Sequence, residues 1–192
     1  AEFQMRMETY RIVKFNEPYL PLKSYANIVK GNALRIDWNE VLPAQKLSYI
    51  MGNPPFLGYK GQSDEQKEDL AFVLADEKKK MISKKLDYVA GWYTKAAQMI
   101  SHNPKIRAAL VSTNSITQGE QVALMWKPLV EKFGLWIDFA YRTFVWDGKA
   151  NVHCVIIGFG IGERSRMPVI YDGESVMTVN HINAYLMDLD DV

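Results

Sequence analysis

The sequence lacks the residues that would build a disulfide framework, a zinc site or a membrane anchor. Its single cysteine, Cys154, excludes a disulfide within the chain, and the apolar residues around it predict a buried side chain rather than a nucleophile. The three histidines lie far apart, at positions 102, 153 and 181, without the spacing of a metal site. The longest apolar run, which starts at Val152, is too short to span a membrane. The N-terminus shows no signal peptide pattern, so we expect a reducing, cytoplasmic environment and no bound metal.

An excess of basic residues is also missing. The 192 residues include 23 lysines and arginines against 22 aspartates and glutamates, which gives a formal net charge of +1. A protein that bound nucleic acid through its overall charge would be more basic, so any such affinity must come from local patches or from other parts of a parent protein. Hydrophobic residues make up 48% of the chain, which is typical of one globular domain with a core.

The most informative stretch is residues 48–56, which read Ser-Tyr-Ile-Met-Gly-Asn-Pro-Pro-Phe. The apolar run before Gly52 predicts a buried strand of a parallel sheet, and the two prolines end the strand because neither can donate to a sheet ladder. The strand therefore delivers Asn53, the carbonyl group of Pro54 and the ring of Phe56 at its carboxyl end. In open α/β sheets, ligands bind at this end of the strands.

Two hydrogen-bond acceptors side by side suit one planar amino group. The side-chain carbonyl of Asn53 is an acceptor, and Pro55 pushes Pro54 towards an extended conformation, with the Pro54 carbonyl as the second acceptor. If both N–H bonds of an amine are held, its lone pair is directed at an electrophile, and Phe56 would stack on the ring that carries the amine. An ordinary turn after a strand is the alternative, because asparagine and proline are common turn residues.

Residues 52–56, Gly-Asn-Pro-Pro-Phe, resemble the catalytic motif of the amino-methyltransferases that use S-adenosylmethionine, above all the DNA adenine methyltransferases. Residues 111–121 and 152–159 are similar to the large restriction–modification methyltransferases in which an endonuclease and a methylase are fused. The resemblance extends to about Gly160. It implies that the catalytic residues are Asn53, Pro54, Pro55 and Phe56.

The same resemblance implies an α/β fold with a partial Rossmann-like class I methyltransferase sheet, mostly parallel and with an antiparallel hairpin at its edge. Apolar runs predict strands at 26–29, 48–51, 106–111, 135–141 and 152–159. Helical spacing of apolar residues predicts a helix over 87–100. A capping box at Thr117–Glu120 predicts the start of a second helix, and Pro128 predicts a kink or a break in it. The short connection between the last two strands contains no helix, which favours a hairpin.

Three more residues gain roles from the resemblance. The hairpin loop would supply a second aromatic ring against a base that has left the double helix, and Phe144 and Trp146 are the candidates. Asn32 follows a predicted strand and Gly31, at a place where the family often has a residue that contacts the adenine of the cofactor. The alternatives are a hairpin tip anchored by its aromatic residues and an asparagine in an ordinary turn.

The glycine-rich cofactor turn of this fold, of the form Asp/Phe-x-Gly-x-Gly, does not occur before residue 53, where the resemblance requires it. Residues 158–162 are rich in glycine but follow the last strand. We therefore expect residues 1–162 to be the C-terminal part of a catalytic domain and residues 163–192 the truncated start of a following segment. The main binding loop for S-adenosylmethionine and the target-recognition region would belong to missing regions of the same polypeptide.

The predicted function of the parent protein is site-specific methylation of the exocyclic amine of adenine in double-stranded DNA, in a restriction–modification or phage-defence system. The asparagine and the terminal phenylalanine of the motif favour adenine, and the base must flip out of the stack to reach Asn53. Amino groups of cytosine, RNA or a protein glutamine are the alternative substrates. Outside the enzymes, the alternative is a non-catalytic interaction module that keeps the fold as a scaffold.

The missing cofactor turn predicts that this chain on its own does not methylate DNA. The measurement is transfer of a labelled methyl group from S-adenosylmethionine to DNA by the purified chain, with the parent protein as the positive control. Transfer by the isolated chain above background would show the prediction to be wrong.

Overall fold

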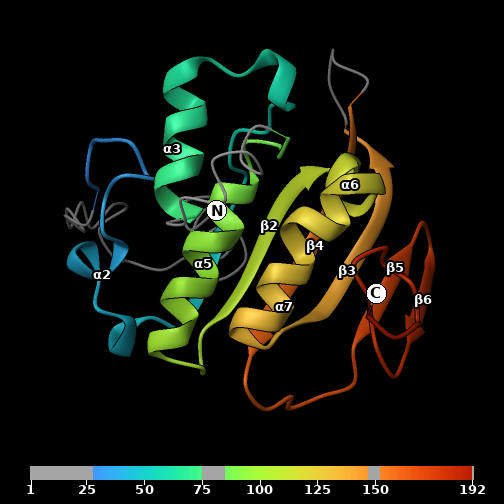
Figure 1. The fold of residues 1–192 in the computed structure, drawn as a ribbon. Coiled ribbons are helices and arrows are strands. Elements are labelled where there is room, and N and C mark those ends of the chain that lie inside the picture. The colour runs from blue at the N-terminus through green and yellow to red at the C-terminus, as the bar shows by residue number, and fades with distance from the viewer. Residues whose placement is uncertain (1–27, 75–84, 147–151, 192) are drawn as a thin grey trace, which may run out of the picture.

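A six-stranded mixed sheet organises the computed structural model, which describes residues 28–74, 85–146 and 152–191 (Figure 1). The strands follow the order β1-β2-β4-β3-β5-β6 across the sheet. Their bounds are β1 Tyr49–Gly52, β2 Arg107–Thr113, β3 Leu135–Val145, β4 His153–Ile161, β5 Val169–Asp172 and β6 Ser175–Thr178. The helices are α2 Trp38–Val41, α3 Asp64–Leu74, α5 Ala90–His102, α6 Gly119–Gln121, the π-helical segment η5 Val122–Trp126 and α7 Lys127–Phe133. Short 3₁₀ turns are η1 Ala44–Lys46, η2 Tyr59–Gly61 and η4 Asn114–Thr117. Helices α5 and α7 lie side by side across one face of the sheet (Figure 1).

The α/β class and the antiparallel pairing of the two long strands are confirmed, but the sheet is not mostly parallel. Within the described residues, β1–β2 and β3–β5 are parallel, whereas β4 is antiparallel to both of its neighbours and β6 is antiparallel to β5. The hairpin of β3 and β4 also lies inside the sheet rather than at its edge. The reason is that β4 pairs with β2 on one side and β5 pairs with the outer side of β3. The Rossmann-like assignment stays a prediction.

Strand β1 takes the expected parallel place beside β2, with Gly52 opposite Leu110, but the prediction that it is buried is wrong. Tyr49 is 68% exposed and Met51 is 79% exposed. In the part of the chain that the structure describes, β1 has a partner strand on one side only. The apolar run that predicted burial therefore lies on an edge strand.

The two ends of the described chain also differ from the expected strand set. Of the strand expected over 26–29, residues 26 and 27 lie outside the described ranges, and Ile28 and Val29 form no strand. At the other end, β5 and β6 extend the same sheet past residue 162, because β5 pairs directly with β3. The domain boundary expected at this residue stays a prediction.

Helix α5 buries the apolar face that its sequence predicted and packs against β2 and β4 of the sheet. The ring of Tyr93 stacks on Phe159 of β4, with 5.2 Å between centroids, and meets Trp126 edge-on at 5.4 Å. The Tyr93 hydroxyl forms a hydrogen bond of 2.9 Å with Ser112 Oγ. Burial raises the pKa of Tyr93 far above its usual range, so the hydroxyl stays protonated. This aromatic group therefore joins α5 to β2, β4 and η5.

The second predicted helix runs without interruption from Gly119 to Phe133 but contains the π-helical segment η5, and its capping box does not form. Thr117 donates its hydroxyl to the carbonyl of Asn114 and so ends the turn η4 instead of capping a helix. The chain then passes through α6 and the wider turn of η5 before α7 begins. The helix does not break at Pro128, which lies in the first turn of α7 directly after the π-helical segment, where its missing N–H is tolerated.

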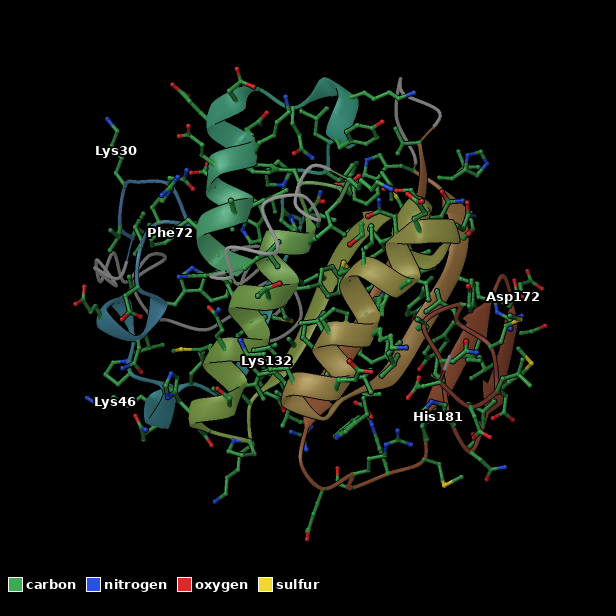
Figure 2. All side chains as sticks on the ribbon, in the orientation of Figure 1. Lys30, Lys46, Phe72, Lys132, Asp172 and His181 are labelled. Atoms are coloured by element: carbon green, nitrogen blue, oxygen red, sulfur yellow. The ribbon has the colours of Figure 1, made fainter. Side chains whose placement is uncertain are left out.

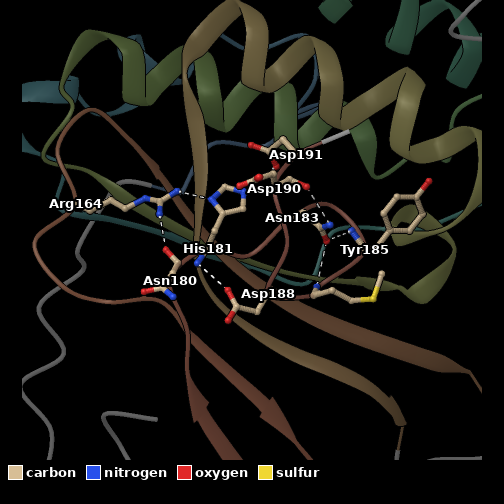
Figure 3. Close-up of polar contacts among 9 residues, drawn as sticks. Arg164, Asn180, His181, Asn183, Tyr185, Asp188, Asp190 and Asp191 are labelled. Carbon is tan, nitrogen blue, oxygen red and sulfur yellow. Dashed lines mark hydrogen bonds and ion pairs between the residues drawn. The ribbon is translucent and has the colours of Figure 1, made fainter.

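The C-terminal segment forms a tight turn around Asn183, which is 1% exposed (Figure 3). The side-chain oxygen of Asn183 accepts two backbone N–H groups of the same turn, at 3.0 and 3.2 Å. His181 lies between Arg164, which donates to its Nδ1 at 3.2 Å, and Asp191, whose carboxylate is 3.1 Å from its Nε2. Since an arginine can only donate, Nδ1 of His181 is the acceptor of this contact.

Gly158 lies on β4 where the ring of Phe139 covers it, so an added Cβ would overlap that ring. Gly158→Ala is expected to destabilise the chain by about 1–3 kcal/mol, because the ring must move within a packed sheet. Thermal unfolding measures this loss. Gly58→Ala is the control, since nothing lies within 4 Å of its added Cβ. Equal unfolding midpoints for the two variants would disprove the close packing of Gly158.

Candidate functional site

Several chain segments meet at one edge of the sheet, where β1, β2 and β3 reach their carboxyl ends. Strands β1 and β2 run parallel and both end there. Strand β4 begins there, because it is antiparallel to β2 and to β3. In Figure 1 this edge is the upper one, beside α6. It carries residues 53–57, 113–115 and 144–146, which we call the carboxyl edge.

Residues 53–57, the motif loop, leave β1 along an irregular path that contains no helix or strand. Asn53 is exposed, while Pro54 behind it is buried. Phe56 is half-buried and packs against the hydrophobic core. The loop therefore presents the amide of Asn53 at the surface and is held from behind by apolar side chains. The catalytic roles of these residues and of Pro55 stay predictions.

The far end of the motif loop is fixed at Leu57 by hydrogen bonds to three other residues. The Leu57 N–H donates to Asp87 Oδ1 at 3.0 Å. The Leu57 carbonyl accepts from Gln62 Nε2 at 2.8 Å and from the N–H of Tyr88 at 3.0 Å. Both backbone polar groups of this residue are therefore satisfied within the protein.

Asp87 is the centre of this anchor and is 4% exposed. Its Oδ1 also accepts the N–H of Val89, at 3.1 Å, where α5 begins. Burial raises the pKa of the Asp87 carboxyl, although hydrogen bonds from Val89, Leu57 and Thr113 oppose this shift. The side chain of Gln121, at the end of α6, accepts the N–H of Asp87 at 3.0 Å. The anchor therefore joins the motif loop, α5, α6 and the end of β2.

Phe144 and Trp146 come to the carboxyl edge at the end of β3. Their ring centroids lie 6.3 Å apart, and Trp146 is 40% exposed. Strands β2 and β4 lie between β1 and β3, so three strand spacings of about 4.8 Å, roughly 14 Å, separate Asn53 from these rings. The structure therefore brings the motif loop and both aromatic residues to one edge, on opposite sides of β2 and β4.

Asn32 lies in a local turn. Its Oδ1 accepts the N–H of Leu34 at 3.0 Å, and its Nδ2 donates to Asp69 Oδ2 at 2.7 Å. Asp69 also accepts from Arg35 Nε at 2.6 Å and from the hydroxyl of Tyr88 at 3.0 Å. Both polar groups of the Asn32 side chain are thus engaged within the protein, as in an Asx turn. Its predicted contact with a cofactor stays a prediction.

The cluster around Asp69 is linked to the motif loop through one residue. The guanidinium of Arg35 lies 4.6 Å from the ring centroid of Phe72, on the outer side of α3 (Figure 2). Burial raises the pKa of Asp69, but its hydrogen bonds, first of all the one from Arg35, outweigh burial and lower the pKa. Tyr88 bonds Asp69 through its hydroxyl and Leu57 through its backbone, so it connects the two anchors.

Neither a metal centre nor a membrane helix occurs among the residues that the structure describes. No three side chains of histidine, cysteine, aspartate or glutamate come together there in the way that a metal ion requires. No helix there combines the length and the apolar character needed to cross a membrane. Cys154 is buried in β4, as predicted, and burial raises its pKa, which is typical of an unreactive thiol.

The sequence pointed to the motif loop but not to the residues that anchor it. Asp87 was included only in the helical pattern 87–100, although an aspartate directly before such a pattern is a signal for a helix cap. Gln62 and Gln121 carry no local signal, because their partners are distant in the sequence or belong to other elements. Side chains of this kind are found from the fold and not from a motif.

Known proteins similar to this chain are DNA methyltransferases. The family model described as MmeI, DNA-methyltransferase domain matches residues 1–172. DNA methyltransferase A of Bacillus subtilis (strain 168) is 38% identical over 199 residues, which cover 100% of this chain and 22% of that protein. The solved structure of the Type IIL restriction-modification enzyme MmeI in complex with DNA is 46% identical with a TM-score of 0.87, over 99% of this chain and 26% of that one. The chain therefore spans about a quarter of the length of these relatives.

Asp69→Asn is expected to lower the free energy of unfolding by about 1–3 kcal/mol at neutral pH, because an amide offers N–H groups to partners that are themselves donors. The pKa of Asp69 is lowered in the fold, so the ionised carboxylate stabilises the protein above its ordinary value of 3.8. This stabilisation is lost as the pH falls through the lower folded value. Denaturant unfolding is measured for the wild type and for Asp69→Asn at about pH 7 and about pH 3. The difference between their free energies of unfolding should be smaller at the lower pH. A difference that widens would refute the assignment.

Proposed function

This chain belongs to the MmeI DNA-methyltransferase domain family, and from this premise we propose that a longer parent protein methylates the exocyclic amine of adenine in double-stranded DNA. The methyl donor is S-adenosylmethionine, and the setting is a restriction–modification or phage-defence system. The relative named DNA methyltransferase A and the similar restriction-modification enzyme in complex with DNA support this proposal. Because the chain spans about a quarter of these relatives, the target-recognition and main cofactor-binding regions are assigned to other parts of the parent protein.

The observation that carries the proposal is the pair of acceptors at the start of the motif loop. Asn53 is exposed at the carboxyl edge, and the carbonyl of Pro54 follows it directly. Both groups offer carbonyl oxygens, which accept hydrogen bonds, so together they select an amino group. When both N–H bonds of the amine are held, the nitrogen lone pair is directed at the methyl group, and the new N–C bond would form as the bond between that methyl group and the sulfur of the donor breaks. The amine loses a proton afterwards, so no strong base is required.

A base in this site would lie between the motif loop and the end of β3. Phe56 supplies an apolar surface on one side, and Phe144 or Trp146 supplies one on the other. Strands β2 and β4 fill the roughly 14 Å between β1 and β3, so the base would lie beyond the ends of these two strands, with side chains reaching it from both sides. Each stacked ring contributes roughly 1–3 kcal/mol, which is comparable to the few kcal/mol needed to unstack a base. A flipped base is therefore held mainly by these rings and the two acceptors.

At the one position predicted to contact the cofactor, each polar group of the Asn32 side chain has a partner within the protein and keeps one further bonding site. Both polar groups of the Asn32 side chain are already bonded, to the N–H of Leu34 and to Asp69. The sequence also lacks the glycine-rich turn before residue 53. The proposal therefore places the main site for S-adenosylmethionine in other regions of the parent protein.

The test expresses the full-length parent gene, intact and with Asn53→Ala, in a host that does not methylate its own DNA. The alanine removes one of the two acceptors, so methylation is expected to fall by about 100-fold or more. Host DNA is digested to nucleosides, and modified bases are measured by mass spectrometry. Asn180→Ala, at an exposed asparagine outside the carboxyl edge, is the matched control and should keep the full level of methyladenine.

The modified base found in the host DNA distinguishes adenine from cytosine as the substrate, and unmodified DNA excludes both. Methyladenine with the intact gene and with Asn180→Ala, but not with Asn53→Ala, supports the proposed reaction and the role of Asn53. Methylcytosine in the same pattern would keep the acceptor pair and correct the base. Unmodified DNA in cells that contain soluble intact protein would overturn DNA methylation as the function.

A further inference from the structure

Asp87 is a buried carboxylate that has no counter-charge among the residues that the structure describes. It is 4% exposed, and it forms no ion pair within residues 28–74, 85–146 and 152–191. Two other buried carboxylates differ in this respect, since Asp69 is paired with Arg35 and Asp138 with Arg166. Moving a carboxylate out of water without a cation is unfavourable, and burial accordingly raises the pKa of Asp87. Among the described residues, the Asp87 carboxylate is therefore held by hydrogen bonds and not by a cation.

The hydrogen bonds of Asp87 show what the carboxylate holds. Its Oδ1 accepts the N–H of Val89 at 3.1 Å and the N–H of Leu57 at 3.0 Å. The first bond caps the start of α5, which any good capping residue does. The second reaches a residue 30 positions earlier in the sequence, at the end of the motif loop. One oxygen thus ties the loop to the first turn of α5.

Fixing Leu57 restricts Asn53, because the motif loop has little freedom between its ends. At the start of the loop, Gly52 is paired with β2 in the sheet. Pro54 and Pro55 have φ angles that their rings fix near −65°. With both ends bound and two backbone angles fixed, the direction of the Asn53 side chain and of the Pro54 carbonyl depends on where Leu57 is held.

We propose that Asp87 is a positioning residue for methyl transfer, which keeps Asn53 and the carbonyl of Pro54 aimed at one amino group by accepting the N–H of Leu57. The inference rests on the proposed function of the motif loop. A shift of about 1 Å in a reacting geometry lowers the rate by about 100-fold. Losing the bond to Leu57 should therefore lower kcat and leave the KM for DNA nearly unchanged.

The test compares three variants in the full-length parent protein. Asp87→Asn keeps an Oδ1 acceptor and should keep kcat within about fivefold, whereas Asp87→Ala removes the acceptor and should lower kcat about 100-fold. Asp87→Glu keeps the charge but adds a methylene group that displaces the loop, so kcat should fall about tenfold or more. Asp138→Ala is the matched control, because it removes a buried carboxylate near the opposite end of β3. It should lower thermal stability and leave the kcat of the folded enzyme unchanged.

The kcat retained in Asp87→Asn shows whether residue 87 acts as a hydrogen-bond acceptor or through its negative charge. Equal losses in Asp87→Asn and Asp87→Ala would overturn the inference, because they would assign the role to the charge or to a proton. Wild-type kcat in Asp87→Ala would overturn it as well. If Asp87→Ala does not fold, Asp87→Glu decides: a folded variant with wild-type kcat overturns the inference, and a folded variant with reduced kcat supports it.

Hydrogen exchange at the Leu57 amide tests the bond to Asp87 directly, whether or not the parent protein methylates DNA. Pro54 and Pro55 have no amide hydrogen, so exchange near the end of the loop reports on Phe56 and Leu57. The Leu57 amide should exchange about tenfold faster in Asp87→Ala than in the wild type or in Asp87→Asn. If the parent protein methylates no DNA but shows this pattern, the proposed function fails and the positioning contact stands. Unchanged exchange overturns the inference whatever the activity.

Discussion

The parallel pairing of β1 with β2 is the constraint on which the candidate site depends. It ends both strands at one edge of the sheet, so that Asn53 leaves β1 close to the loop that follows β2. Strand β4 returns between β2 and β3 and begins at the same edge, which brings Phe144 and Trp146 to it. A register shift of one residue would turn every side chain of β1 to the other face of the sheet. It would also move the motif loop away from the carboxylate that accepts the N–H of Leu57.

Buried carboxylates fix the irregular segments of this fold, and they do so in two ways. Asp69 joins α3 to the turn at Asn32, and Asp138 joins β3 to the segment before β5 through Arg166, at 3.2 and 2.7 Å. Each of these two carboxylates has an arginine partner, so its charge is compensated. Asp87 instead accepts hydrogen bonds from backbone N–H groups, and burial of its charged carboxylate is unfavourable. Within the described residues, this carboxylate has no arginine or lysine partner, and it lies next to the motif loop.

The sequence predicted the features that depend on neighbouring residues. It did not predict those that depend on the pairing of segments far apart in the chain. The strand over 106–111 and the helix over 87–100 are present, since each depends on the order of neighbouring residues. An apolar run shows that a strand is suited to burial but not whether another strand covers it, which is why β1 was expected to be buried. The position of the hairpin inside the sheet likewise depends on β5, which pairs with β3 from far along the chain. The motif predicted the place of Asn53, whereas its anchor at Asp87 needed the fold.

The central claim is that a base from DNA is held at the carboxyl edge, between the motif loop and the end of β3. Photo-crosslinking tests it most directly. A duplex with 5-iodouracil in place of the target base, at the site mapped from methylated host DNA, is bound to the parent protein and irradiated, and the crosslinked peptide is identified. The account predicts crosslinks at Phe56, Phe144 or Trp146. Crosslinks confined to residues outside this edge would contradict it.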